Sequence, residues 1–222
     1  MVYLYTLFVA WITASAFVQA ADHPLKKVIS PGLTAACGVL VLTGTLMGNV
    51  PLRLGLTLAG AILLLAASDF TFERSEANPS LFTLAMVLGV LSGFIIGTAI
   101  NLTALSSTPS IIHGFAFGIA FAAALFVYRY LAVPKELRIP VLVYLAQAVI
   151  LLGGGLASFY SGNIHFGLWG VLLFVSDSLV GLRAFPNPQK PVRQLDASRI
   201  LFGIIVIYYP ALAVMVSWAL MS

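Results

Sequence analysis

Charged residues are scarce in this chain of 222 residues. Asp, Glu, Lys and Arg together make up 8% of it, whereas a soluble domain has about 25%. Hydrophobic residues account for 61% of the sequence. So little charge excludes an ordinary water-soluble globular domain. The composition instead predicts an all-α fold, a polytopic bundle of transmembrane helices, because helices satisfy their own backbone hydrogen bonds in lipid.

Thiols and metal-binding motifs are also sparse. The single cysteine, Cys37, excludes an intramolecular disulfide and a CxxC metal site. The three histidines, His23, His113 and His165, show neither HExxH nor HxxxH spacing, so we expect no metal and no other cofactor. The motif GxSxG is missing, which argues against a serine hydrolase.

Long apolar runs fill most of the chain, and eight segments can be separated. Each is about long enough to cross a bilayer as a helix, so we expect one transmembrane domain over residues 1–222. The first segment ends in Phe-Val-Gln-Ala-Ala, like a signal cleavage site, but no Lys or Arg precedes it. We therefore interpret it as the first membrane helix. The expected helices cover residues 2–20, 31–49, 52–68, 81–100, 111–131, 139–160, 164–182 and 200–220.

The basic residues predict how these helices are oriented. Among the even-numbered loops, only the second carries a basic residue, Arg53. By the positive-inside rule the odd-numbered loops are cytoplasmic, so both termini are expected on the non-cytoplasmic side of the membrane. We expect this membrane to be the cell (inner) membrane. Because the basic residues flank membrane segments, their positive charge does not indicate a nucleic-acid partner. The odd-numbered loops carry Lys26, Lys27, Arg74, Arg129, Lys135, Arg138, Arg183, Lys190, Arg193 and Arg199.

Two aspartates interrupt the apolar segments. Asp69 directly follows Ser68 at the end of the third segment, and Asp177 lies within the seventh, between Ser176 and Ser178. A carboxylate at hydrocarbon depth costs about 3 kcal/mol or more unless it is paired or faces water, so it marks a candidate functional site. With the predicted orientation, both aspartates lie towards the cytoplasmic leaflet.

The chemistry open to two such carboxyl groups is limited. If they lie close together they cannot both ionise easily, so one serves as an acid and the other as a base. This pair suits hydrolysis of an acetal or enol ether through an oxocarbenium-like state. The same pair would also suit a proton-coupled transporter of a small solute or lipid. A third possibility is a scaffold in which both aspartates are structural.

Three stretches resemble a known family of membrane proteins. The stretch Gly167–Phe185, GLWGVLLFVSDSLVGLRAF, resembles the signature of the YhhN family, which includes the TMEM86-like lysoplasmalogenases. The run Ala66-Ala67-Ser68-Asp69 is similar to the family's Gly-Asp at the end of the third helix, and PVLVYLAQ, residues 140–147, is similar to its sixth helix. The chain departs from the family at Ser30-Pro31, where Lys-Pro is common, and in lacking a His and a Tyr on the fourth helix.

The resemblance implies an eight-helix membrane hydrolase that cleaves the vinyl ether bond of lysoplasmalogens. The products would be a fatty aldehyde and a glycerophospho-ethanolamine or -choline. Asp69 and Asp177 would be the catalytic pair, with no metal, and the partners would be the lysophospholipid substrate and membrane lipids. Other polar side chains within the spans would contact the substrate. These are Asn101, Tyr144, Gln147, Ser176, Ser178, Tyr208 and Tyr209.

The three hypotheses, a lipid hydrolase, a transporter and a scaffold, predict different surroundings for the two aspartates. A lipid hydrolase requires a cleft that opens sideways to lipid and ends at both carboxyl groups. A transporter requires a water path that reaches both aqueous faces. A scaffold requires that Asp69 and Asp177 point at backbone groups or at each other, with no cavity beside them.

Overall fold

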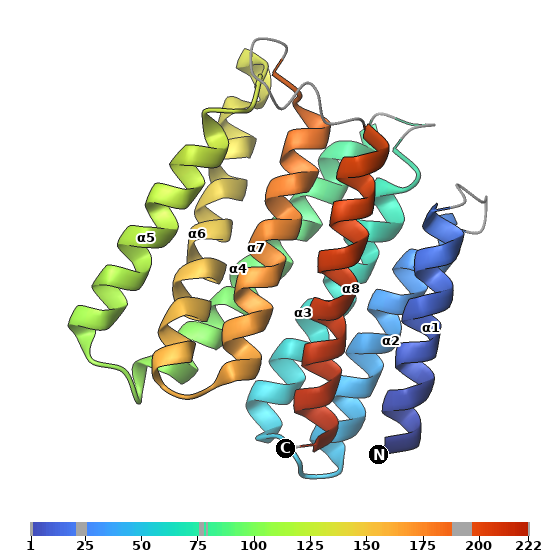
Figure 1. Cartoon of the computed structure of the whole chain (residues 1–222), viewed down its shortest axis with the longest axis vertical. Coiled ribbons are helices and arrows are strands. Elements are labelled where there is room, and N and C mark those ends of the chain that lie inside the picture. Colours follow the sequence, from blue (N-terminus) through green and yellow to red (C-terminus); the bar gives the residue numbers. More distant parts are fainter. Residues whose placement is uncertain (1, 21–25, 76–77, 79, 188–196, 222) are drawn as a thin grey trace. The chain divides into compact units, whose positions relative to one another are not determined.

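The computed structural model describes residues 2–20, 26–75, 78, 80–187 and 197–221. These residues are predominantly helical, and no β-strand occurs among them, only an isolated bridge between Leu131 and Pro186. The all-α prediction is therefore confirmed. The α-helices (Figure 1) are α1 (Val2–Ala20), α2 (Lys26–Leu46), α3 (Leu52–Phe72), α4 (Ser80–Leu105), α5 (Ser110–Tyr128), α6 (Arg138–Tyr160), α7 (Ile164–Ala184) and α8 (Ala197–Met221), with a short 3-10 helix η1 (Lys135–Leu137) before α6.

Seven of the described helices, α2 to α8, are long and apolar enough to cross a membrane. The chain is therefore a multi-pass membrane protein. The apolar part of α1, Val2–Val18, is shorter than these seven spans. An eighth crossing by α1 and the direction in which the helices cross stay predictions.

Several predicted helix ends are wrong. The second helix was expected to begin at Pro31, but α2 begins at Lys26 and contains this proline. Pro31 is no boundary here because membrane helices tolerate proline where neighbouring groups satisfy the freed backbone. The helix ends at Leu46, before Gly48, whose positive φ of 82° belongs to the turn that follows.

The third helix was expected to end at Ser68, but α3 continues to Phe72. Asp69 therefore lies in the last turn of the helix, and its carbonyl oxygen accepts a hydrogen bond from the backbone N–H of Glu73. A single acidic side chain does not interrupt the backbone hydrogen bonds that define a helix. The fourth helix likewise extends to Leu105 instead of residue 100, which places Asn101 inside it.

Several basic residues expected in loops lie instead in terminal helical turns. Lys27, Arg138 and Arg199 belong to the first turns of α2, α6 and α8, and Arg183 belongs to the last turn of α7. Long basic side chains at helix ends reach the membrane interface, so these positions still suit the charge rule. Lys190 and Arg193 lie outside the described residues.

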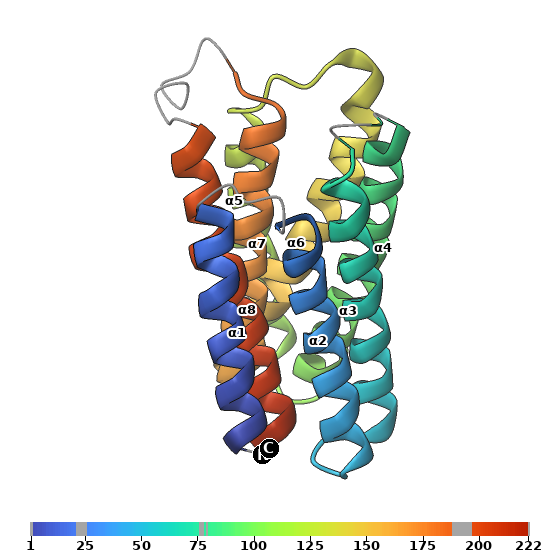
Figure 2. The same cartoon turned by 90° about the vertical axis from the view of Figure 1, so that its right-hand side faces the viewer.

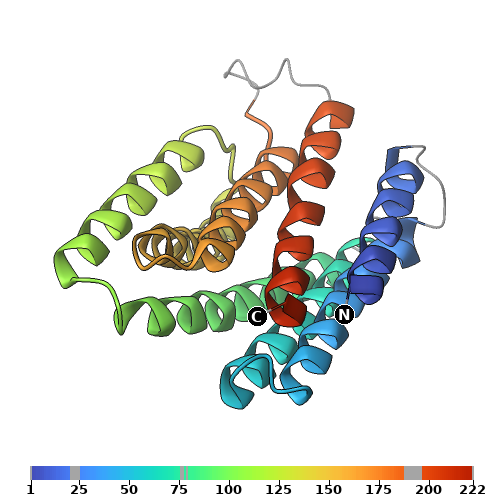
Figure 3. The ribbon, with the colours of Figure 1, turned by 60° about the horizontal axis from the view of Figure 1, so that its bottom comes forward.

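The chain divides into two compact units. Unit 1 comprises Met1–Ala99 and Leu212–Ser222, and unit 2 comprises Ile100–Ala211. Within unit 1, α2 and α3 run antiparallel beside each other and are joined by a short turn (Figures 2 and 3). The C-terminal part of α8 packs on α2 so closely that a Cβ at Gly44 would clash with the carbonyl oxygen of Ala219.

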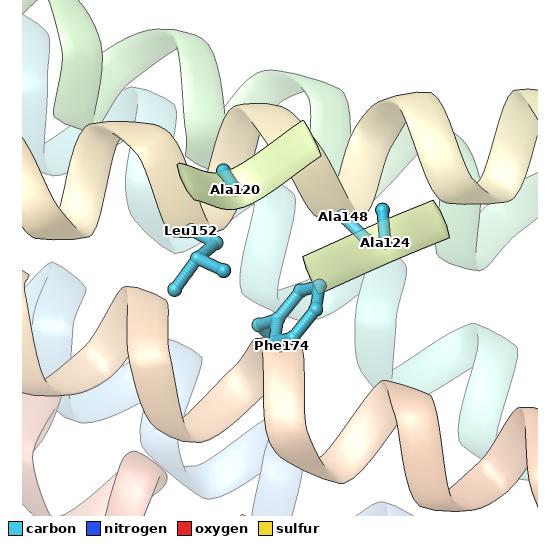
Figure 4. Packing of buried hydrophobic residues seen from close by; sticks show 5 residues of the cluster. All are labelled: Ala120, Ala124, Ala148, Leu152 and Phe174. Carbon is cyan, nitrogen blue, oxygen red and sulfur yellow. The ribbon is translucent and has the colours of Figure 1, made fainter. Parts of the chain in front are cut away.

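Within unit 2, helices α5, α6 and α7 lie side by side (Figure 1). Small residues dominate their shared core, which lets the helices approach closely without a hydrophobic driving force between them. Figure 4 shows this core, which consists of Ala120, Ala124, Ala148, Leu152 and Phe174.

Glycines bring the backbones of α6 and α7 into direct contact. A Cβ built on Gly170 would lie 2.6 Å from the carbonyl oxygen of Leu151 and 2.9 Å from the Cα of Gly155. The connection between the two helices is equally tight. Gly162 adopts a positive φ of 80°, and the side chain of Asn163 then accepts a hydrogen bond from the third residue after it, which caps α7.

This contact predicts different outcomes for two glycine-to-alanine substitutions. Gly170→Ala should destabilise the protein by about 1–3 kcal/mol, because the added methyl group meets backbone atoms that cannot rotate away. Gly118→Ala on the exposed face of α5 meets nothing within 4 Å and should be neutral or slightly stabilising. Thermal unfolding of both purified variants in detergent measures the difference, and equal stabilities would contradict the close approach.

Candidate active site

The glycine contact fixes which residues of α6 face Asp177. Gly170 lies against Leu151 in an antiparallel pair of helices. Moving seven positions along α7, about two helical turns, leads to Asp177, and moving seven positions back along α6 leads to Tyr144. The register set by small residues in the middle of the helices therefore positions polar residues near their other ends.

Asp177 is half-buried and takes two side-chain hydrogen bonds from α6. The Nε2 atom of Gln147 lies 3.5 Å from the Oδ2 atom of Asp177, at the outer limit of a hydrogen bond. The side chain of Tyr144 forms the second hydrogen bond to the carboxyl group. Gln147 is only 1% exposed and Tyr144 is half-buried, so the cluster lies within the helix pair and reaches its surface at the tyrosine and the aspartate.

Asp69 is held by a different kind of contact, within unit 1. The hydroxyl of Thr34 on α2 donates to the Oδ2 atom of Asp69 over 2.7 Å. The same hydroxyl lies 3.4 Å from the carbonyl oxygen of Ser30. Since a threonine has one donor hydrogen, the shorter contact to the carboxylate is the stronger one. Thr34 is fully buried and Asp69 is half-buried.

The serines beside Asp177 have different surroundings from each other. The hydroxyl of Ser178 donates to the carbonyl oxygen of Phe174 over 2.7 Å, one turn back on the same helix. This bond uses its donor hydrogen, so Ser178 is left with acceptor capacity only. Ser176 is buried.

Asn101 and the two tyrosines of α8 make contacts of their own. The Nδ2 atom of Asn101 donates to the carbonyl oxygen of Ile150 over 3.0 Å, which ties the end of α4 to α6. Tyr209 is buried and Tyr208 half-buried, and their rings lie 6.1 Å apart at 45°. Asn101 therefore has a clear structural role, and its contact with substrate stays a prediction.

The structure thus groups the predicted site residues in two places. Tyr144, Gln147 and Asp177 come together in unit 2, and Asp69 meets Thr34 in unit 1. The pairing of Asp69 with Asp177 stays a prediction. Among the described residues, no three His, Cys, Asp or Glu side chains are placed to hold a metal ion.

Thr34 is the residue near a predicted site that the sequence reasoning missed. It comes from a different helix, 35 positions before Asp69, so no local spacing links the two. The available signal was a polar residue inside an apolar segment, and Thr34 shares that signal with several threonines whose hydroxyls donate to the backbone of their own helix. Examples are Thr43, Thr45 and Thr57.

The contact between α2 and α3 can be tested with two threonine-to-valine substitutions. Thr34→Val removes the hydroxyl that donates to the Asp69 carboxylate with little change of shape, and should lower the free energy of unfolding by about 1–3 kcal/mol. Thr57→Val removes a hydroxyl that donates to the carbonyl oxygen of Arg53 on the exposed surface of α3, so the change should stay within about 0.5 kcal/mol. Chemical denaturation in detergent compares the two, and similar losses would contradict a role for Thr34 in holding Asp69.

Comparison of the chain with protein-family models, curated proteins and solved structures found no match in any of the three. The likeness to the YhhN family therefore rests on the three stretches quoted above. A function for this membrane protein has to be proposed from those stretches and from the chemistry of the residues around its two aspartates.

Proposed function

We propose that this protein is a membrane-embedded hydrolase that cleaves the vinyl ether bond of lysoplasmalogens. The observation that carries the proposal is the carboxyl group of Asp177, which lies in an apolar helix and is held by Gln147 and Tyr144 of the neighbouring helix. A carboxyl group with fixed direction and partial access is the group that acid–base catalysis requires. The likeness of residues 167–185 to the YhhN signature supports this substrate class.

The proposed reaction consumes one water molecule and needs only proton transfers. One carboxyl group of the pair Asp69 and Asp177 gives its proton to the vinyl carbon distal to the ether oxygen, which leaves an oxocarbenium ion. Water adds to the cationic carbon and gives a proton to the other carboxylate. The resulting hemiacetal breaks its bond to the glycerol oxygen, which takes the proton from the second carboxyl group. The hemiacetal hydroxyl gives its proton to the first carboxylate and becomes the aldehyde carbonyl, so both groups return to their starting states. The products are a fatty aldehyde and the glycerophospho-alcohol.

The contacts of Asp177 suit a group that changes its charge during such a cycle. The tyrosine hydroxyl and the glutamine amide are neutral, so neither forms an ion pair that would fix the carboxyl group in one state. Among the polar side chains proposed to line the substrate path, Tyr144 and Gln147 have direct contacts with Asp177. We further propose that α1 is an eighth membrane crossing and that both termini face away from the cytoplasm.

The proposal is tested by aldehyde release from lysoplasmalogens incubated with purified protein in detergent or liposomes. Asp69→Asn and Asp177→Asn should each reduce kcat by about 100-fold or more, the loss typical of removing a general acid or base. Glu136→Gln in the exposed η1 helix removes a carboxylate outside the site, so it should keep wild-type turnover.

The outcomes separate the proposed activity from its alternatives. Turnover by wild type that is lost in both aspartate variants, with unchanged elution from a sizing column, supports the catalytic pair. Loss in Asp177→Asn alone restricts the site to unit 2. No release of aldehyde from either the ethanolamine or the choline substrate rejects the hydrolase, and proton-coupled uptake into proteoliposomes then tests the transporter.

A further inference from the structure

The side-chain amide of Gln147 has a hydrogen-bond partner at its nitrogen atom, but none at its oxygen atom among the described residues. Its Nε2 atom faces the Oδ2 atom of Asp177, and its Oε1 atom is buried without a hydrogen-bond partner among the described residues. The whole side chain is 1% exposed. A buried carbonyl oxygen with no donor costs about 1–3 kcal/mol, so Oε1 requires a hydrogen-bond donor that the described residues do not supply.

The orientation of the amide follows from its neighbour. An ionised carboxylate offers acceptors only, so it draws the NH₂ group of Gln147 towards itself and turns the carbonyl oxygen away. The unsatisfied Oε1 atom is therefore held next to the carboxyl group by the same contact that orients the side chain. A ligand group that donates a hydrogen bond to Oε1 would lie beside Asp177.

We propose that Oε1 of Gln147 accepts a hydrogen bond from the free sn-2 hydroxyl group of a lysolipid, and so selects lysolipids over forms acylated at that position. This inference rests on the vinyl ether hydrolysis proposed above. The hydroxyl is only a few bonds from the ether oxygen, so a ligand held through it has its vinyl group close to Asp177. Acylation replaces the donor hydrogen and leaves Oε1 unsatisfied, while adding a chain at a buried atom.

The test compares two choline-headgroup substrates, a lysoplasmalogen and its 2-deoxy analogue. With choline as the head group, the sn-2 hydroxyl is the principal donor on the substrate, and its removal adds no bulk. Wild-type protein should show a kcat/KM about tenfold or more higher for the hydroxyl form, the effect of leaving a buried acceptor without its donor. If only ethanolamine lipids are turned over, the same pair is made with that head group.

Two variants on α6 distinguish selectivity from a general loss of activity. Gln147→Met keeps the volume and removes the acceptor, so the ratio of kcat/KM for the two substrates should fall to near one. Tyr144→Phe removes the other hydrogen bond to Asp177 and leaves Oε1 in place, so both rates should fall while the ratio is retained. A ratio near one in wild type, or a ratio that survives in Gln147→Met, overturns the inference.

A binding measurement covers the case in which Gln147→Met fails to fold. Non-hydrolysable alkyl ether analogues with and without the sn-2 hydroxyl are tested as inhibitors of wild type, and the hydroxyl form should bind about tenfold or more tightly. Equal inhibition overturns the inference while the hydrolase proposal stands. If wild type hydrolyses neither substrate, the proposed function fails and this inference fails with it.

Discussion

The arrangement of the candidate site depends on the backbone contact between α6 and α7. Glycine at positions 155 and 170 lets the two helices approach until backbone meets backbone, and the capped turn at Gly162 and Asn163 fixes their antiparallel register. From that point, two helical turns lead to the carboxyl group of Asp177 and its partners. The polar cluster is thus positioned by apolar packing well away from it, which is how a site in lipid can be kept rigid when few charges are available to build it.

At both aspartates, the free-energy cost of placing a carboxyl group in an apolar helix is reduced in the same way. Each takes hydrogen bonds from uncharged side chains of a neighbouring helix, Thr34 for Asp69 and Gln147 with Tyr144 for Asp177. Neutral donors reduce the cost of burial without the second desolvation that a buried Lys or Arg would add. At Asp177 they also leave the carboxyl group able to exchange protons, whereas a buried salt bridge would hold it ionised.

Much of the fold was predictable from composition and from the length of apolar runs, because lipid allows few backbone structures. Helix ends were harder to predict. Pro31 and Asp69 were both taken as boundaries, yet α2 and α3 run through them, since a helix ends where its backbone hydrogen bonds end. Asp177 could be identified because it is a charged residue within an apolar segment. Tyr144 and Gln147 could be identified because they too are polar residues within an apolar segment. Thr34 was missed because a contact between helices leaves no trace in local spacing.

The division of α8 between the two compact units bears on how the chain matures during synthesis. Cys37, Gly44 and Asn49 of unit 1 all contact the part of the chain from Leu212 onward, which the ribosome makes after unit 2. Unit 2 is continuous in sequence and becomes complete earlier than unit 1, although α2 and α3 emerge first. Helices α2 and α3 therefore lack these contacts until the C-terminal part of α8 has been made, an interval in which membrane chaperones and quality-control proteases have access to them.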